Sequence, residues 1–145
     1  MMTNKSKRRI VREKVLQILY AYEMNKESLK SISREVLSEV TDDTDKNFAL
    51  ELIRRVLENV DDLDERIIQR VTNWEMNRIA LIDKILLRMG ICELLHFPDI
   101  PPKVSINESI EISKDYSTAG SAKFINGILD AVLAEEKKYG KLNKT

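Results

Sequence analysis

The chain has 145 residues, which is the usual size of one domain and enough to bury a single core. Hydrophobic residues make up 43% and charged residues 33% of the sequence, a composition that excludes a disordered tail. The 24 basic and 24 acidic residues cancel, but residues 1–14 carry six basic residues against one acidic residue, whereas the stretch from Glu35 to Arg66 carries eleven acidic residues against four basic ones. We therefore predict a charge dipole whose basic end is the N-terminus.

The apolar segments are too short for a membrane span, which needs about 18 consecutive apolar residues. The first residues are basic and polar and no apolar run follows them, so we expect neither an export signal nor an anchor. Cys92 is the only cysteine, which excludes an internal disulfide and leaves little material for a metal site. The expectation is a soluble cytoplasmic protein without a metal or another cofactor.

Three helices are predicted in the N-terminal half. Apolar residues at helical spacing place the first over residues 6–24 and the second over residues 29–40, with Ser28 as the cap of the second. The third is predicted as one continuous helix over residues 45–71, because its apolar residues step by four and three without interruption. Residues 72–77 break this pattern.

The C-terminal half is predicted to open with a central helix followed by a loop. Residues 79–95 resume the helical pattern with few charges, so this helix should pack against neighbours on more than one side. All three prolines lie between Pro98 and Pro102, which indicates a loop or hinge. Gly90 lies inside this helix and Gly127 inside a later one, so close helix contact should compensate for a cost of about 1 kcal/mol at each relative to alanine.

Two more helices are predicted after the prolines. Ser105 and Glu108 have the spacing of a capping box, which would open the first of them. Residues 117–120 form a turn, and Phe124 belongs to the apolar face of a last helix that ends near Gly140. Since no segment alternates convincingly at the period of a strand, we predict an all-α fold of about seven helices in two small bundles.

Four basic residues at the start of the first predicted helix are candidate phosphate ligands, namely Lys7, Arg8, Arg9 and Arg12. Cations at a helix N-terminus oppose the helix dipole at a cost of about a few tenths of a kcal/mol, so this position favours the binding of a polyanion. Such contacts would supply affinity and orientation, while sequence would be read elsewhere. A merely solvated helix start stays open as the alternative.

A second candidate surface lies at the turn that follows Tyr116. Tyr116 is able to stack on an unpaired base, and the residues near enough in sequence to hydrogen-bond that base are Ser121, Lys123 and Asn126. The alternative is a tyrosine that closes the core, and periodicity taken alone favours this alternative.

The usual catalytic motifs are missing from the sequence. It contains no glycine-rich phosphate loop and no HExxH segment. His96, the only histidine, stands beside Phe97 at a predicted helix end, which is more typical of a capping residue than of a ligand. One histidine and one cysteine leave almost no material for pairs of nucleophile and base, and the carboxylates have the spacing of a solvated helix face. We therefore predict that the protein is not an enzyme.

Several segments resemble the NusB family in order along nearly the whole chain. The opening RRIVREKVLQILYAYE is similar to the arginine-rich first helix of that family. The stretches that resemble its central and C-terminal helices are IDKILLRMGICELL, the DIP of Asp99 to Pro101, VSINESIEISKDYS and SAKFINGILD. The most specific match is the closing motif, in which Ser121 is followed by KFING at residues 123–127.

The resemblance implies one domain over residues 1–145, with two perpendicular helical subbundles at about residues 6–71 and 77–140. It implies a bacterial transcription antitermination factor that binds single-stranded boxA RNA of ribosomal RNA operons together with NusE, a small-subunit ribosomal protein. The pair would act in the cytoplasm with RNA polymerase and other Nus factors, without a membrane. Whether the free protein is a monomer or a homodimer stays open.

The resemblance also implies residue roles. Arg8, Arg9 and Arg12, with Lys7 beside them, would bind phosphates, and the residues near the bases would be Tyr116, Ser121, Lys123 and Asn126. The surface for NusE would include Tyr20 and Asp83. The chain departs from the family pattern at Gly120, where relatives often carry Asp or Asn, so a side-chain contact from that position is lost here.

Two other interpretations stay open. The N-terminal domain of a family of ribosomal RNA cytosine methyltransferases is similar to NusB, but this chain is expected to have no room for a methyl-donor domain. The other interpretation is a helical adaptor that binds only proteins and whose basic N-terminus has no functional role. Salt dependence separates it from an RNA-binding protein, since neutralising about four phosphates gives a slope of about −3 in log K against log salt.

Overall fold

The computed structural model describes residues 5–26 and 28–140, apart from the side chains of residues 73 and 74. Within these residues all regular structure is helical, in eight helices, which confirms the predicted all-α fold. None of the described helices has both the length and the apolar character to cross a membrane. The chain divides into two compact units, residues 1–54 and residues 55–145.

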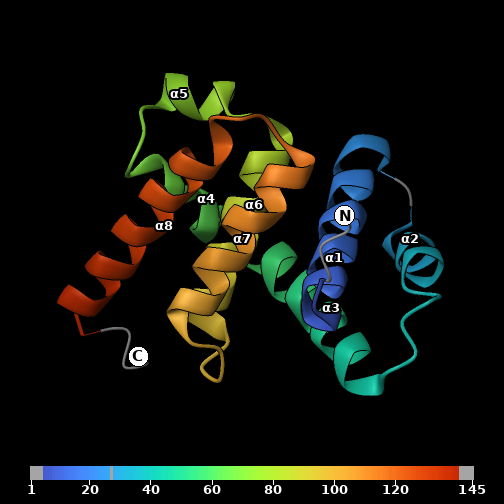
Figure 1. Cartoon of the computed structure of the whole chain (residues 1–145). Helices are drawn as coiled ribbons and strands as arrows, with labels where there is room; N and C mark the ends of the chain where they lie inside the picture. The colour runs from blue at the N-terminus through green and yellow to red at the C-terminus, as the bar shows by residue number, and fades with distance from the viewer. Residues whose placement is uncertain (1–4, 27, 141–145) are drawn as a thin grey trace. The chain divides into compact units, whose positions relative to one another are not determined.

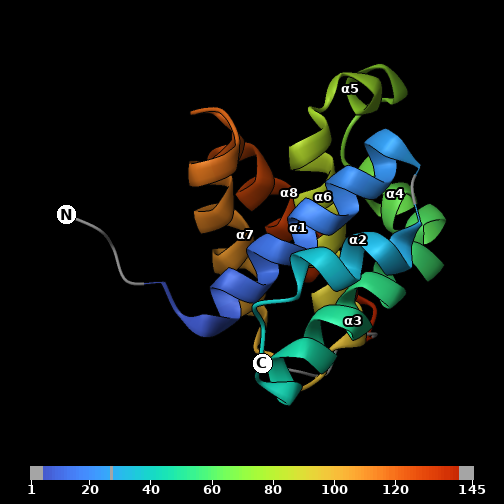
Figure 2. The ribbon, with the colours of Figure 1, turned by 90° about the vertical axis from the view of Figure 1, so that its right-hand side faces the viewer.

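The first unit contains α1 (Lys7–Asn25), α2 (Leu29–Val36) and the first part of α3 (Asp43–Glu58). The α2 helix packs along α1, as Figure 2 shows. Most of the residues whose spacing predicted these helices are buried, among them Val11, Val15, Ile18, Leu19, Ile32 and Ile53. Periodicity therefore identified the buried faces of this unit correctly.

The second helix begins where the sequence indicates but ends earlier. Ser28, the predicted cap, accepts a hydrogen bond from the backbone N–H of Ser31 at 3.4 Å. The prediction that this helix reaches residue 40 is wrong, because α2 ends at Val36. Leu37 is the C-cap residue and still buries its side chain, so an apolar residue at helical spacing packs here from outside the helix.

The prediction of one continuous helix over residues 45–71 is also wrong. The helix is interrupted at Asn59, which separates α3 from α4 (Val60–Ile68) and has φ −115° and ψ 15°. Asn59 Nδ2 donates a hydrogen bond of 2.7 Å to the carbonyl oxygen of Arg55, one turn earlier. A short amide side chain that bonds the neighbouring backbone competes with helical hydrogen bonds, which accounts for a break at this residue.

The second unit is organised around its most apolar helix. It contains α4, α5 (Asn73–Arg78), α6 (Leu81–His96), α7 (Pro102–Tyr116) and α8 (Ser121–Lys138). The α6 helix packs against α4, α7 and α8, and Figure 1 shows α7 and α8 side by side. Its fully buried side chains include Leu86, Leu87 and Ile91, so the prediction of a central helix with neighbours on more than one side is confirmed.

The capping box lies at a different place from the predicted one. Ser105 does not open a helix, since α7 begins at Pro102 and the Ser105 hydroxyl, fully buried, donates to Glu93 Oε1 at 2.8 Å. A box with both hydrogen bonds does form at the start of α5, between Thr72 and Glu75. The segment predicted only as a break is therefore a short capped helix.

The two helical glycines differ in their surroundings. A Cβ atom added to Gly90 would lie 2.9 Å from Cδ1 of Leu129 and 3.0 Å from Oγ of Ser109, so α6 approaches α8 and α7 closely at this point. This confirms the predicted close contact at Gly90. A Cβ atom added to Gly127 would have nothing within 4 Å, so the same prediction is wrong there.

Alanine at these two glycines should therefore have opposite effects on stability. Gly127→Ala should stabilise the protein by about 0.5–1 kcal/mol, because alanine loses less backbone entropy in a helix. Gly90→Ala should destabilise it by about 1 kcal/mol or more, since the added methyl group overpacks a buried crossing. Urea denaturation of both variants provides the comparison, each serving as the control for the other, and equal shifts would contradict it.

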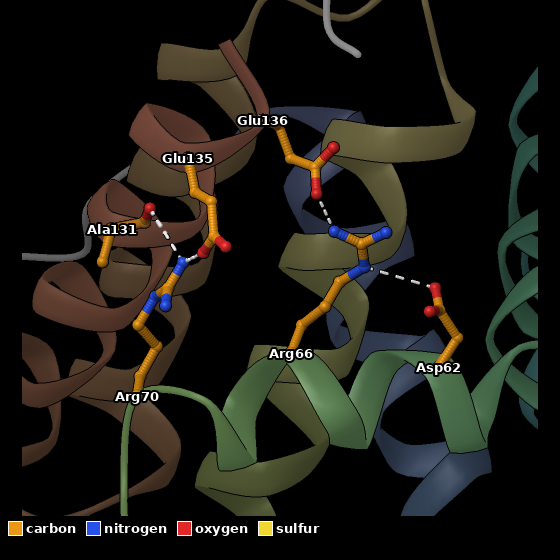
Figure 3. Close-up of polar contacts among 6 residues, drawn as sticks. All are labelled: Asp62, Arg66, Arg70, Ala131, Glu135 and Glu136. Atoms are coloured by element: carbon orange, nitrogen blue, oxygen red, sulfur yellow. Dashed lines mark hydrogen bonds and ion pairs between the residues drawn. The ribbon is translucent and has the colours of Figure 1, made fainter. Parts of the chain in front are cut away.

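Arginine and glutamate side chains join α4 and the turn after it to the last turns of α8. Figure 3 shows Arg66 directed at Glu136 and Arg70 directed at Glu135, and both pairs are in contact. Arg66 Nε also lies 3.2 Å from Oδ2 of Asp62. Glu136 is only 5% exposed, so its pairing with Arg66 satisfies a carboxylate that would otherwise be buried without a counter-charge.

Candidate nucleic-acid interface

The basic cluster, defined as Lys7, Arg8, Arg9 and Arg12, occupies the first two turns of α1. Ser6 caps this helix by accepting a hydrogen bond from the backbone N–H of Arg9 at 3.0 Å. Lys7 is exposed, and Arg8 and Arg9 are partly exposed. Arg12 is only 3% exposed, so it presents far less of its side chain than a phosphate ligand on the surface would.

Arg8 and Arg12 share one aromatic neighbour. The guanidinium carbon of Arg8 lies 4.2 Å from the centroid of the Phe48 ring, and that of Arg12 lies 5.1 Å from it. A guanidinium at such a distance is attracted by the electron-rich face of the ring. Phe48, which lies on α3 and is 8% exposed, therefore orients both arginines, a role that the sequence did not indicate.

Several acidic residues of the first unit pair with its basic residues. Arg8 Nε lies 3.2 Å from Oδ1 of Asp45, Lys5 Nζ lies 2.7 Å from Oε2 of Glu13, and Lys14 is paired with Glu39 at 3.9 Å. The charge dipole expected from the sequence is therefore partly cancelled inside this unit, because residues after α2 fold back onto α1. Net charge along the chain did not reveal this pairing.

A cavity of about 240 Å³ lies beside the start of α1. Its charged lining consists of two ammonium groups, on Lys7 and Lys14, and three carboxylates, on Glu39, Asp42 and Asp45. A cavity with more carboxylates than ammonium groups does not attract a phosphate. Any phosphate contacts of the basic cluster are therefore expected on its exposed side.

The second candidate surface surrounds the turn between α7 and α8. Tyr116 is the last residue of α7 and is partly exposed, while Lys123 and Asn126 are exposed on the first two turns of α8. Ser121 is 3% exposed, and its hydroxyl donates to Oδ2 of Asp83 at 2.7 Å. The predicted contact of Ser121 with a base stays a prediction, and the structure gives its hydroxyl a partner within the protein.

Asp83 joins this turn to the start of α6. Ser117 Oγ donates to Oδ1 of Asp83 at 2.6 Å, so both carboxylate oxygens accept a hydroxyl hydrogen bond. Ser117 and Ser121 lie 2.9 Å apart at their hydroxyls, and Thr118 lies 3.1 Å from Ser121. Asp83 is 7% exposed, whereas Tyr20, the other residue implied for the partner surface, is 37% exposed on α1.

A cavity of about 390 Å³ adjoins the same turn. Asp83 and Thr118 contribute polar groups to its lining, and Ile79, Ala80 and Phe124 contribute apolar ones. Phe124, predicted to lie in the core, is in fact only partly buried and lines this cavity. Glu75 and Arg78 of α5 also line the cavity, and the capping spacing of Thr72 and Glu75 is the sequence signal that could have revealed this helix.

His96 is the last residue of α6, and its Nε2 atom is buried without a hydrogen-bond partner among the described residues. Burial, followed by the nearby positive charge of Arg55, lowers the pKa of His96 below its ordinary value of 6.5. In the described part of the chain no group of three or more His, Cys, Asp or Glu side chains is arranged to hold a metal ion.

Acidification should destabilise the protein through His96. The unfolded chain takes up a proton at the ordinary pKa of 6.5, whereas the folded chain does so only at lower pH. The contribution of neutral His96 is therefore complete above that value and is lost as the pH falls below it. Between pH 7 and pH 5 the urea midpoint of the wild type should fall relative to that of His96→Gln. A difference that stays constant would contradict this assignment.

Together these observations define a small all-α protein with two candidate ligand surfaces, a basic helix start and a polar turn between two helices. The NusB family profile matches residues 9–134. The chain belongs to the NusB family of transcription antitermination proteins.

Two relatives carry the name transcription antitermination protein NusB. The protein of Chloroherpeton thalassium is 48% identical over 140 residues, which are 95% of this chain and 66% of that relative. The protein of Salinibacter ruber is 44% identical over 144 residues, which are 97% of this chain and 89% of that relative. The chain thus spans just under two thirds of the first relative and most of the second.

Solved structures have the same fold. NusB of T. maritima is 38% identical with a TM-score of 0.83, and the match covers 94% of this chain and 99% of that one. A NusB chain crystallised with NusE and double-stranded RNA is 21% identical with a TM-score of 0.79, over 88% of this chain and 96% of that one. At that identity the likeness concerns the fold alone.

Proposed function

We propose that this protein is a non-catalytic, cytoplasmic transcription antitermination factor that binds boxA RNA of ribosomal RNA operons together with NusE. The observation that carries the proposal is the family match over residues 9–134, with 44–48% identity to the two relatives named for antitermination. The pair would act with RNA polymerase and other Nus factors. The basic cluster and the exposed residues around the α7–α8 turn support an RNA ligand.

The residue roles belong to the same proposal. Lys7, Arg8 and Arg9 would bind phosphates, and the residues near the bases would be Tyr116, Lys123 and Asn126. Arg12 and Ser121, each 3% exposed, would act by positioning their neighbours. Tyr20 would contact NusE, with Asp83 as the second residue of that surface.

One family domain with subbundles at about residues 6–71 and 77–140 is part of the proposal. This division follows the family resemblance, whereas the packing of α4 against α6 groups α4 with the second compact unit. The free state, monomer or homodimer, is a separate question for sedimentation analysis.

Gly120 would be a point of difference from many relatives. It is the exposed N-cap residue of α8, its backbone is in the right-handed helical region with φ −83°, and no side chain caps the helix there. A Cβ atom added at Gly120 would meet nothing within 4 Å, so Asp or Asn would fit at this position. Because this chain has glycine at position 120, it lacks both the helix cap and the potential RNA contact that an Asp or Asn side chain would provide.

Fluorescence anisotropy with a short labelled boxA RNA tests the function. A scrambled RNA of equal length is the control, and each RNA is titrated with and without NusE at several salt concentrations. We expect preferential binding to boxA, tightening by NusE, and a slope of log K against log salt of about −3 if about four phosphates are neutralised. Equal binding to both RNAs, or no binding even with NusE, would contradict the proposal.

The pairing of Arg8 with Asp45 favours one alternative, a helical adaptor that binds only protein. In that case the basic cluster would serve the packing of the first unit, and binding of a partner would depend weakly on salt. The same titrations separate the two functions, because the adaptor would bind NusE or another protein and neither RNA.

A further inference from the structure

The contact between Arg8 and Asp45 links α1 to α3 within the first unit. It also engages an arginine that is proposed to bind RNA phosphate. Arg8 Nε donates to Oδ1 of Asp45 at 3.2 Å. The Arg8 side chain is 37% exposed and that of Asp45 is 14% exposed, so solvent reaches the arginine more readily than the carboxylate. The guanidinium is therefore accessible to an incoming anion while one of its nitrogens already has an anionic partner.

We propose that Asp45 competes with RNA phosphate for Arg8 and thereby sets the affinity of the basic cluster for RNA. This inference rests on the proposed RNA-binding function and extends it to an acidic residue that contacts no RNA itself. A carboxylate and a phosphate oxygen accept the same guanidinium hydrogen bonds. RNA that binds Arg8 must therefore displace the Asp45 contact, and its binding is weakened by the strength of that contact.

The backbone of Asp45 is held by the start of α3, and its side chain is only 14% exposed. It stands in the first turn of the helix, and its backbone N–H donates to Oδ1 of Asp42 at 3.0 Å. Glu39, the carboxylate paired with Lys14, is by contrast 87% exposed and lies at 3.9 Å. A fixed, largely buried carboxylate competes with a phosphate more effectively than a mobile exposed one, since it loses little side-chain entropy in the contact.

Phe48 keeps Arg8 in position whether or not Asp45 is in contact. The guanidinium carbon of Arg8 lies 4.2 Å from the centroid of the Phe48 ring, one turn beyond Asp45 on α3. Stacking of this kind leaves the edge of the guanidinium, where its N–H groups point, free to exchange one acceptor for another. Removing the Asp45 charge should therefore release Arg8 for RNA without disordering it.

The decisive variant is Asp45→Asn, which keeps the size of the side chain and the backbone N–H. We expect it to bind boxA RNA about twofold to fivefold more tightly than the wild type, the range expected from losing a partly exposed ion pair. Asp43→Asn is the matched control, because Asp43 is exposed in the same helix turn and forms no ion pair among the described residues. Both variants change the net charge equally.

Fluorescence anisotropy with boxA RNA at about 0.15 M salt separates the two variants, because the screening length of about 8 Å then suppresses the general effect of net charge. A larger gain for Asp45→Asn than for Asp43→Asn supports the competition. A double-mutant cycle adds Arg8→Ala, in which the gain from Asp45→Asn should disappear. Equal affinities for the two variants, or a gain that persists without Arg8, would overturn it.

Two results separate the role of Asp45 from RNA binding itself. Wild-type binding that prefers boxA over the scrambled RNA, combined with equal Asp45→Asn and Asp43→Asn affinities, overturns only the competition. A wild type that binds no RNA overturns both. A variant that merely loosens the fold would bind more weakly, so a gain in affinity cannot come from damage.

A measurement on the wild type keeps the inference testable if Asp45→Asn is unstable. The Nε–H resonance of Arg8 in ¹⁵N-labelled protein can be assigned by its loss in Arg8→Lys. It should shift on titration with boxA RNA, because the Asp45 acceptor is exchanged for phosphate. A resonance that keeps its position at saturating RNA would show that the Asp45 contact survives and would overturn the competition.

Discussion

Replacing both Lys7 and Arg8 by alanine should lower the affinity for boxA RNA by at least about tenfold, since the loss of even one charged hydrogen bond costs about 1.5 kcal/mol. The slope of log K against log salt should become shallower by about 1.4, because two fewer phosphates of a single strand are neutralised. Affinity for the scrambled RNA should fall in the same proportion, since phosphate contacts carry no sequence information. Anisotropy titrations over a range of salt provide all three readouts.

The matched control for this double substitution is Lys137→Ala with Lys138→Ala. These lysines are exposed in the last turn of α8 and their loss changes the net charge by the same amount. An equal loss of affinity in the control would show that net charge, and not the basic cluster, attracts RNA. Arg12 is left intact because it is 3% exposed beside Phe48, and its removal would test packing as well as binding.

Replacing Asp83 by alanine should cost about 2 kcal/mol of stability, which for a chain of this size lowers Tm by roughly 6 °C. Two serine hydroxyls donate to this buried carboxylate, at 2.6 Å from Ser117 and 2.7 Å from Ser121, and both hydrogen bonds to a charged acceptor would be lost. The cost of burying the carboxylate is recovered, so the net loss is smaller than the sum of two charged hydrogen bonds. Thermal unfolding followed by circular dichroism measures the effect.

Asp99→Ala is the control for this substitution, because Asp99 is an exposed acidic residue in the loop before α7. Ser117→Ala and Ser121→Ala should each cost about 1 kcal/mol, since each removes one of the two hydrogen bonds. If Asp83 mainly serves a protein interface, its alanine variant would instead keep the wild-type Tm and lose affinity for NusE. That result would contradict the positioning role at the turn and support the role implied by the family resemblance.

The helices could be predicted from the sequence because they depend on local periodicity, whereas their breaks and caps depend on particular side chains. The helix over residues 45–71 was predicted as continuous because the apolar residues on both sides of Asn59 stay on one face. Leu63 N still donates to Asn59 O at 2.9 Å, so the interruption preserves the helical register. The hydrogen bond of Asn59 to Arg55 is local, but nothing in an apolar pattern reveals it.

Tertiary contacts account for the other errors. The spacing of Ser105 and Glu108 is that of a capping box, yet Ser105 bonds to Glu93 on α6, a partner that only the packed structure supplies. The start of α7 at Pro102 was within reach of the sequence, since proline is favoured at the first helical position.

The sequence predicted which residue types form the candidate site, but it did not predict which of these residues are buried. Lys7, Lys123 and Asn126 are exposed as a ligand surface requires. Arg12 and Ser121 are buried by neighbours that lie far from them in the sequence, Phe48 in one case and Asp83 in the other. Periodicity places a residue on a helix face, but the partner that covers it is set by the fold.

The ion pairs at the end of α8 bear on how the protein can be labelled or trimmed. Arg66 and Arg70 depend on Glu136 and Glu135, which lie in the last turns of that helix (Figure 3). A protease that cut before Glu135 would leave both arginines without these counter-charges, so loss of the end of α8 would destabilise α4 and the turn after it. A fluorophore or affinity tag is therefore best attached after Gly140, because α8 ends at Lys138 and both glutamates lie before that residue.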